Sequence, residues 1–196
     1  MRRILTAAAI IAVPVLVILA IMQPKPLPMC VQQAKTQLSP SECISKTILN
    51  ADSFKNDCLG LSFQSAAPFL FYSEPYKAPF INFAVPKANY SIKVLAFQNP
   101  YPHIATPESQ KVFLAAAKKN LLMTNPKAKI TKEEIISFSG VPAIYIAANN
   151  KGMIERRYYF INRGRWVELT LASKDVNFTK NIKPAQEALL KTIRLY

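Results

Sequence analysis

The sequence predicts an α+β fold in which helices pack on an antiparallel sheet. Segments with the alternating apolar pattern of strands occur in two runs, and a helical segment follows each run. Short turns containing Gly or Asn join the strands of the second run, and such turns connect antiparallel neighbours. With 196 residues, of which 51% are hydrophobic and 18% charged, the chain can bury one core and carry a tail.

The N-terminal residues predict a membrane anchor. Residues 1–3 are basic, and residues 4–22 form an uncharged run that spans about 28 Å as a helix, close to the thickness of a bilayer core. Basic residues that flank a transmembrane helix usually remain in the cytoplasm. We therefore expect a cytoplasmic stub, a single transmembrane helix in the cytoplasmic (inner) membrane and a periplasmic domain. A cleaved signal peptide is the alternative, although Met22 is too large for a cleavage site.

Residues 23–53 predict a stalk with a short helix. The first part is rich in Pro and Gln, as extended linkers are. Ser39 suits an N-cap, Pro40 the first helical position and Glu42 the closing position of a capping box. The helix is expected over residues 40–50. Its expected buried stripe is Ile44, Ile48 and Leu49.

Three cysteines, Cys30, Cys43 and Cys58, lie in the first third of the exported part. In an oxidising compartment two of them can pair, and three pairings are possible. The Cys43–Cys58 pairing is favoured because it would fasten the stalk to the start of the domain; three free thiols are the alternative. Their spacing matches no zinc motif and no His lies nearby, so we expect no metal site.

Residues 54–196 predict the folded domain, which begins with strands separated by prolines. A helix follows from Thr106, an N-cap residue before Pro107, and ends before Asn125. Four strands joined by short turns and a last helix complete the domain. The expected strands are 59–63, 69–72, 80–85, 90–97, 130–138, 143–148, 153–161 and 165–172, and the expected C-terminal elements are a helix over 183–192 and a short strand over 192–195.

Five stretches follow one another in a recognisable order. They are Cys58–Phe63, Ser139–Ala143, Arg157–Ile161, Arg165–Leu171 and Thr192–Leu195. In this order the chain resembles, over residues 56–196, the PsbP-like superfamily, which includes the bacterial DcrB-like proteins. The resemblance implies an α/β/α sandwich around an antiparallel sheet. It also implies a non-enzymatic accessory or binding protein, often at a membrane, with no shared catalytic residues. The family's Pro-x-x-Trp after the opening strand is absent, and Pro68-Phe69 stands nearby.

An arginine-rich hairpin is the candidate contact surface. Arginine binds carboxylates and phosphates through two parallel N–H donors, and aromatic side chains anchor interfaces. Because successive strand residues point to opposite faces, Arg157 and Tyr159 are expected on one face and Arg156 and Tyr158 on the other. A solvated hairpin with one Trp in the core is the alternative. The residues selected for binding a partner or an anionic ligand are Arg157, Tyr159, Arg163, Arg165 and Trp166.

The formal net charge of +14 suits an acidic envelope protein, anionic lipid or an anionic polymer. Nucleic acid is disfavoured, because the domain is expected outside the cell and carries no binding motif. His103, the only histidine, lies in a proline-rich loop without a partner group, and Glu133 and Glu134 point to opposite faces of a strand.

We therefore expect no catalytic residue and no cofactor. The sequence predicts a non-enzymatic, membrane-anchored binding or accessory protein of an envelope complex. The alternatives are an enzyme or binder acting on an anionic envelope ligand, with His103 as the base of an enzyme, and a purely structural brace of a membrane assembly.

Overall fold

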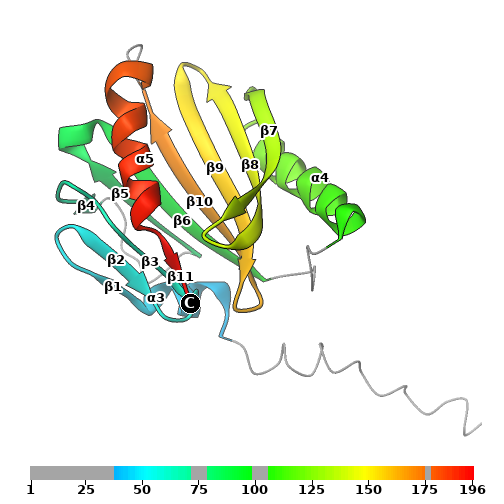
Figure 1. Cartoon of the computed structure of the whole chain (residues 1–196), viewed down its shortest axis with the longest axis horizontal. Coiled ribbons are helices and arrows are strands. Elements are labelled where there is room, and N and C mark those ends of the chain that lie inside the picture. The colour runs from blue at the N-terminus through cyan, green and yellow to red at the C-terminus, as the bar shows by residue number, and fades with distance from the viewer. Residues whose placement is uncertain (1–37, 72–78, 99–105, 175–177) are drawn as a thin grey trace, which may run out of the picture. The chain divides into compact units, whose positions relative to one another are not determined.

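Two antiparallel sheets form the core of the domain in a computed structural model that describes residues 38–71, 79–98, 106–174 and 178–196. The large sheet has the strand order β4-β5-β6-β10-β9-β8-β7, and the small sheet has the order β1-β2-β3-β11 (Figure 1). Among these residues no helix is long and apolar enough to cross a bilayer, and the expected anchor lies outside them.

The elements have the following bounds. The large sheet consists of β4 (Leu70–Phe71), β5 (Phe80–Val85), β6 (Tyr90–Gln98), β7 (Lys129–Phe138), β8 (Val141–Asn150), β9 (Met153–Asn162) and β10 (Arg165–Ser173). The small sheet consists of β1 (Thr47–Leu49), β2 (Ser53–Asn56), β3 (Leu61–Gln64) and β11 (Arg194–Leu195). The helices are α3 (Pro40–Ser45), η1 (Pro86–Ala88), α4 (Pro107–Thr124), the π-helical turn η2 (Phe178–Ile182) and α5 (Lys183–Thr192).

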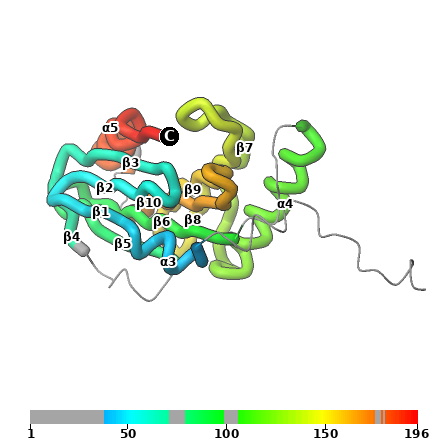
Figure 2. The backbone as a smooth tube through the Cα atoms, turned by 90° about the horizontal axis from the view of Figure 1, so that it is seen from below, coloured from blue at the N-terminus to red at the C-terminus, as the bar shows by residue number. Residues whose placement is uncertain are grey.

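Both faces of the large sheet are covered. Helix α5 and the small sheet pack on one face, and α4 packs on the other. Figure 2 shows α5 beside β3 and away from α4. Strands β9 and β10 lie in the middle of the sheet, where Leu169 faces Tyr158 and Glu168 faces Tyr159 in the register. Side chains on both faces of β9 and β10 are therefore buried, as in a sheet that lies between two layers.

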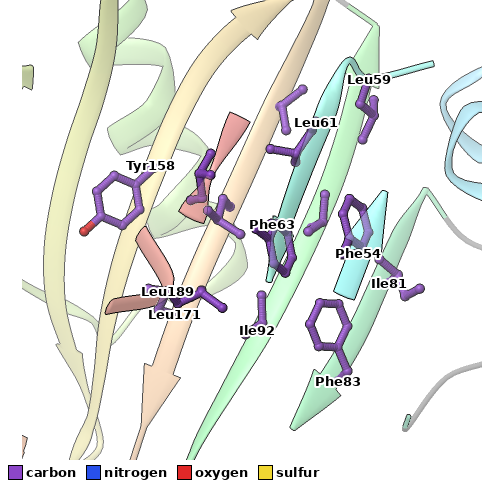
Figure 3. Close-up of a cluster of buried hydrophobic side chains, with 14 of the residues drawn as sticks. Phe54, Leu59, Leu61, Phe63, Ile81, Phe83, Ile92, Tyr158, Leu171 and Leu189 are labelled. Carbon is purple, nitrogen blue, oxygen red and sulfur yellow. The ribbon is translucent and has the colours of Figure 1, made fainter. Parts of the chain in front are cut away.

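Aromatic rings dominate the core between the two sheets. Phe54 and Phe63 stack with their centroids 4.7 Å apart, and Phe69 and Phe83 lie 4.6 Å apart. Figure 3 shows strands of both sheets contributing side chains to one cluster, which Leu189 of α5 joins. Because each buried aromatic ring removes a large apolar area from water, this cluster is a main source of stability.

A second core lies under α4. Helix residues Phe113, Ala117 and Leu121 are fully buried, at the four-residue spacing that brings them to one face. Phe113 contacts Trp166 of β10, with ring centroids 4.7 Å apart. A capping box of Thr106 and Ser109 begins the helix, so its predicted start and end agree with the structure.

The segment expected as a stalk is partly a piece of the domain. The compact unit begins at Leu38 and not at residue 54. Helix α3 does begin with the predicted capping box and buries Ile44, but it ends at Ser45, so the prediction of a helix to residue 50 was wrong. The β-branched residues Thr47 and Ile48 pair with β2 instead, and Ile48 is 54% exposed.

A disulfide joins Cys43 to Cys58 across this added segment. The buried side chain of Asn56 supports the same junction, because its Nδ2 donates to the Cys43 carbonyl at 2.9 Å and to Thr47 Oγ1 at 2.8 Å. Its Oδ1 accepts from the backbone N–H of Leu59 at 2.9 Å. Residues 38–53 are thus tied covalently and by hydrogen bonds to the body of the domain. Cys30 lies outside the described residues.

The tip of the β9–β10 hairpin forms a clasp with the C-terminus. Arg163 donates from Nε to the Tyr196 carbonyl at 2.8 Å and from Nη1 to the Asp57 carbonyl at 2.6 Å. The Tyr196 hydroxyl donates to Asp57 Oδ1 at 2.8 Å, and Tyr196 N–H donates to the Gly60 carbonyl at 3.0 Å. Arg163 therefore acts as a structural link between chain segments.

The clasp predicts a loss of stability in alkali. Partial burial and the hydrogen bond to Asp57 raise the pKa of Tyr196 from 10.0 to about 12. Since the folded state holds this proton more tightly than the unfolded chain, the clasp is fully stabilising below pH 10 and loses strength as the pH rises to about 12. Urea unfolding between pH 10 and about 12 should show that the free energy of unfolding falls more steeply with pH for the wild type than for Tyr196→Phe. An equal fall for both proteins would contradict the role of Tyr196 in the clasp.

Candidate functional site

The arginine hairpin places Arg157 in a buried ion network under the α4 side of the sheet. Its Nη2 donates to Glu155 Oε2 at 2.5 Å, and its Nη1 donates to Glu168 Oε1 at 3.0 Å. Thr170 Oγ1 also donates to Glu168 Oε1, at 2.7 Å. The side chains of Arg157, Glu155 and Glu168 are only 8%, 7% and 3% exposed, so this network is shielded from solvent.

The charges of this network nearly balance. Burial disfavours the charged guanidinium of Arg157, but Glu168, Tyr159 and Glu155 outweigh that effect and raise its pKa. Burial lowers the pKa of Lys93 on neighbouring β6, against the opposing influence of Glu168. Two carboxylates thus share the guanidinium of Arg157 inside the protein, and half-buried Lys93 supplies a second positive charge in the same region. Such an arrangement holds strands in register and offers no free charge to a ligand.

The other residues selected from the sequence are also engaged internally. Tyr159 is fully buried, and burial raises the pKa of its phenol. Trp166 is packed under α4, and Arg163 belongs to the C-terminal clasp. Arg165 is 5% exposed and donates from Nη2 to the Leu38 carbonyl. The expectation of a contact surface is therefore corrected for Arg157, Tyr159, Arg165 and Trp166, which are buried on the central strands β9 and β10. Arg163 is exposed in the turn between these strands, but its guanidinium is held by the clasp.

A groove lies on the opposite face, between α5 and the curled strands β7, β8 and β9. We call it the Arg156 groove. Its volume is about 530 Å³, within the range of ligand sites. Its lining residues are Thr131, Lys132, Glu134, Ile136, Tyr145, Ala147, Ile154, Arg156, Tyr158, Phe178, Lys183 and Glu187.

Strand alternation positions the groove side chains. Register pairs Tyr145 with Tyr158 and Ala147 with Arg156 across β8 and β9, so these four residues share one face. The rings of Tyr145 and Tyr158 lie 5.2 Å apart. In Figure 3 the Tyr158 hydroxyl points away from the phenylalanine cluster, and burial raises the pKa of this phenol above its usual value.

The cations of the groove differ in their partners. Lys132 pairs with Glu134 at 3.0 Å, and Lys183 pairs with Glu187 at 3.8 Å. Arg156 has no carboxylate within 4.0 Å among the residues that the structure describes. Its guanidinium contacts neutral groups only: Tyr145 Oη at 3.4 Å from Nε and Gln186 Oε1 at 3.4 Å from Nη1. Both contacts are long for hydrogen bonds, so Arg156 retains donor capacity.

A buried amide adjoins this guanidinium. Gln186 of α5 is 0% exposed, and its Nε2 has no hydrogen-bond partner among the described residues. The Oε1 of the same amide accepts from Arg156. An unsatisfied buried donor costs free energy, and this one lies behind an arginine whose own hydrogen bonds are long.

The remaining sequence candidates do not join this site. Glu133 points to the α4 side and pairs with Lys118 at 2.8 Å, whereas Glu134 lines the groove, so the two carboxylates do not share a site. His103 lies outside the described residues. No group of three potential metal ligands occurs in the described part of the chain. The signal that could have indicated the groove was the other face of the same strand, which carries Arg156 and Tyr158.

Comparisons with known proteins bear on the fold. The chain matches no family model and no curated protein sequence. Among solved structures it is similar to cyanobacterial PsbP (CyanoP) from Synechocystis sp. PCC 6803, with 11% identity and a TM-score of 0.57, over 76% of this chain and 95% of that chain. A Pseudomonas aeruginosa protein of unknown function, PA94, shares 15% identity with a TM-score of 0.46, over 63% of this chain and 94% of that chain. The similarity to cyanobacterial PsbP shows that the chain has a PsbP-like fold.

Proposed function

We propose that this protein is a non-enzymatic binding or accessory protein of an envelope complex. A single N-terminal helix holds it at the cytoplasmic membrane, with the domain outside, and the Arg156 groove receives an acidic segment of a protein partner. The PsbP-like fold supports this class, since proteins of that superfamily are mostly non-enzymatic accessory or binding proteins.

The observation that carries the proposal is the free capacity of Arg156. A guanidinium prefers a carboxylate that accepts two parallel hydrogen bonds, and here it has only long contacts to Tyr145 and Gln186. Because the unpaired Nε2 of Gln186 belongs to the amide that already contacts Arg156, a carboxylate bound there lies close to an additional donor. One acidic side chain of a partner would thus find its donors on Arg156, with the buried amide of Gln186 behind that guanidinium.

The rest of the groove suits a peptide segment. Tyr145 has cations near its ring, with Lys132 Nζ 5.8 Å and Arg156 Cζ 5.9 Å from the centroid. Ile136, Ile154 and Phe178 add apolar surface. The ion pairs of Lys132 and Lys183 lie at exposed positions, where charges contribute more to selectivity and association rate than to affinity.

Charge reversal at Arg156 tests the proposal. We expect Arg156→Glu to weaken partner binding by about thirtyfold or more, because a carboxylate would then face the partner's carboxylate. The measurement is cross-linked affinity capture by the full-length protein, with the captured protein identified and its affinity determined.

The matched control is Lys119→Glu, an equal charge change at an exposed position of α4. It should leave capture unchanged, and thermal unfolding should show that both variants fold. Undiminished capture by Arg156→Glu would contradict the site. If the wild type captures no protein, the accessory function is wrong and a binder of an anionic envelope ligand becomes the better interpretation.

A further inference from the structure

We infer that the outer face of the small sheet binds anionic lipid headgroups. A second hollow of about 500 Å³ lies on this face, next to the C-terminal end of α5. We call it the basic shelf. Its lining residues are Ile48, Asn50, Ser53, Phe54, Lys55, Ser62, Phe63, Gln64, Lys191, Thr192 and Arg194.

The basic shelf carries three cations, Lys55, Lys191 and Arg194, and its described lining residues include no carboxylate. Of these three, Lys55 alone has an ion pair with a residue that the structure describes, Asp57 at 3.2 Å, and both side chains are more than half exposed, so that pair is weak. Arg194 Nη1 donates to the carbonyls of Lys191 at 3.1 Å and Ile193 at 3.0 Å, which fixes the guanidinium at the end of α5.

Two further properties favour a membrane surface over a soluble anion. The shelf is an open hollow in which the hydroxyl groups of Ser53 and Ser62 can donate to phosphate oxygens, whereas Gln64 Nε2 already donates to Asp52 Oδ2 at 3.3 Å. Ile48, an aliphatic side chain that is 54% exposed, lies among the cations. Cations beside an exposed apolar side chain are typical of surfaces that rest on anionic bilayers.

The occupant is a lipid headgroup because of where the domain is held. This step rests on the membrane anchor of the proposed function and is independent of the Arg156 groove. Residues 23–37 can extend to about 50 Å, which lets the domain rest on the bilayer to which it is tethered. Tethering raises the effective concentration of lipid at the shelf, so even weak headgroup contacts are populated.

Hydrogen exchange of the full chain in two kinds of bilayer tests the inference. The chain is reconstituted in discs of phosphatidylcholine alone and in discs that also contain phosphatidylglycerol. We expect slower amide exchange in β2, β3 and the last turn of α5 only in the anionic discs. Each shelf cation replaced by glutamine should reduce this protection about fivefold, and the triple variant of Lys55, Lys191 and Arg194 should abolish it.

The matched control replaces Lys111, Lys119 and Lys127, which are exposed away from the shelf, by glutamine. It should keep the lipid-dependent protection, and equal loss in both triple variants would overturn the shelf as a site. Identical exchange of the wild type in the two bilayers would also overturn it. Partner capture that survives in the shelf variant would separate the two sites, because the proposed function depends on Arg156.

Discussion

Replacing Arg157 by alanine should lower the free energy of unfolding by about 3–5 kcal/mol, because it leaves two buried carboxylates without their cation. Glu155 accepts two hydrogen bonds from Arg157, and Glu168 accepts one from Arg157 and one from Thr170. Both carboxylates are buried. Chemical denaturation by urea measures the change directly.

Two comparisons separate this mechanism from a loss of packing. Arg156→Ala changes the same residue type one position earlier, at a half-buried site without a carboxylate partner, and should cost less than about 1 kcal/mol. Adding Glu155→Gln and Glu168→Gln to Arg157→Met removes the unpaired charges and should recover most of the loss. An Arg157→Ala variant as stable as the wild type would show that the network is not shielded from solvent.

Gly60→Ala should be the second strongly destabilising change, by about 2–4 kcal/mol. Gly60 has φ +59, and a Cβ there would lie 2.2 Å from the Tyr196 carbonyl oxygen. That oxygen accepts from Arg163, and the Gly60 carbonyl itself accepts from the Tyr196 N–H and from Asn162 Nδ2. The substitution would therefore force apart the β9–β10 hairpin tip and the C-terminal strand.

Gly152→Ala is the matched control for this prediction. It also has a positive φ, +81, but its Cβ would meet no atom within 4 Å. It should therefore show only the conformational cost of about 1 kcal/mol. Urea unfolding of the two variants separates the clash of the added Cβ from the cost of the positive φ. Equal losses of unfolding free energy would show that the clasp accommodates the Cβ without cost.

Most elements of the fold could be predicted from the sequence, because their signals are local. The strand Tyr90–Gln98 shows a regular alternation of apolar and polar residues, and α4 begins at a Thr-Pro pair that suits an N-cap. Strands β1 and β2 were missed, since segments of 3 and 4 residues contain too few alternations, and the capping box at Ser39 suggested a longer helix.

The site was harder to predict than the fold. Alternation correctly separated Arg157 and Tyr159 from Arg156 and Tyr158. It could not tell which side of β9 keeps an accessible cation, because both faces of a central strand are covered and both carry apolar residues. The choice of Arg157 failed for that reason. Of its two ion partners, Glu155 lies two residues earlier on the same face of β9, whereas Glu168 is brought beside Arg157 only by the pairing of β9 with β10.

Site-specific photo-cross-linking of the full-length protein tests most directly whether a partner binds in the Arg156 groove. A photoreactive residue at Lys132, on the rim of the Arg156 groove, should cross-link to a discrete protein partner, and Arg156→Glu should remove that product. The same probe at Met123, which is 71% exposed on α4, should give no such product. A partner that cross-links from Met123 and not from Lys132, or that persists with Arg156→Glu, would contradict the assignment of the groove as the binding site.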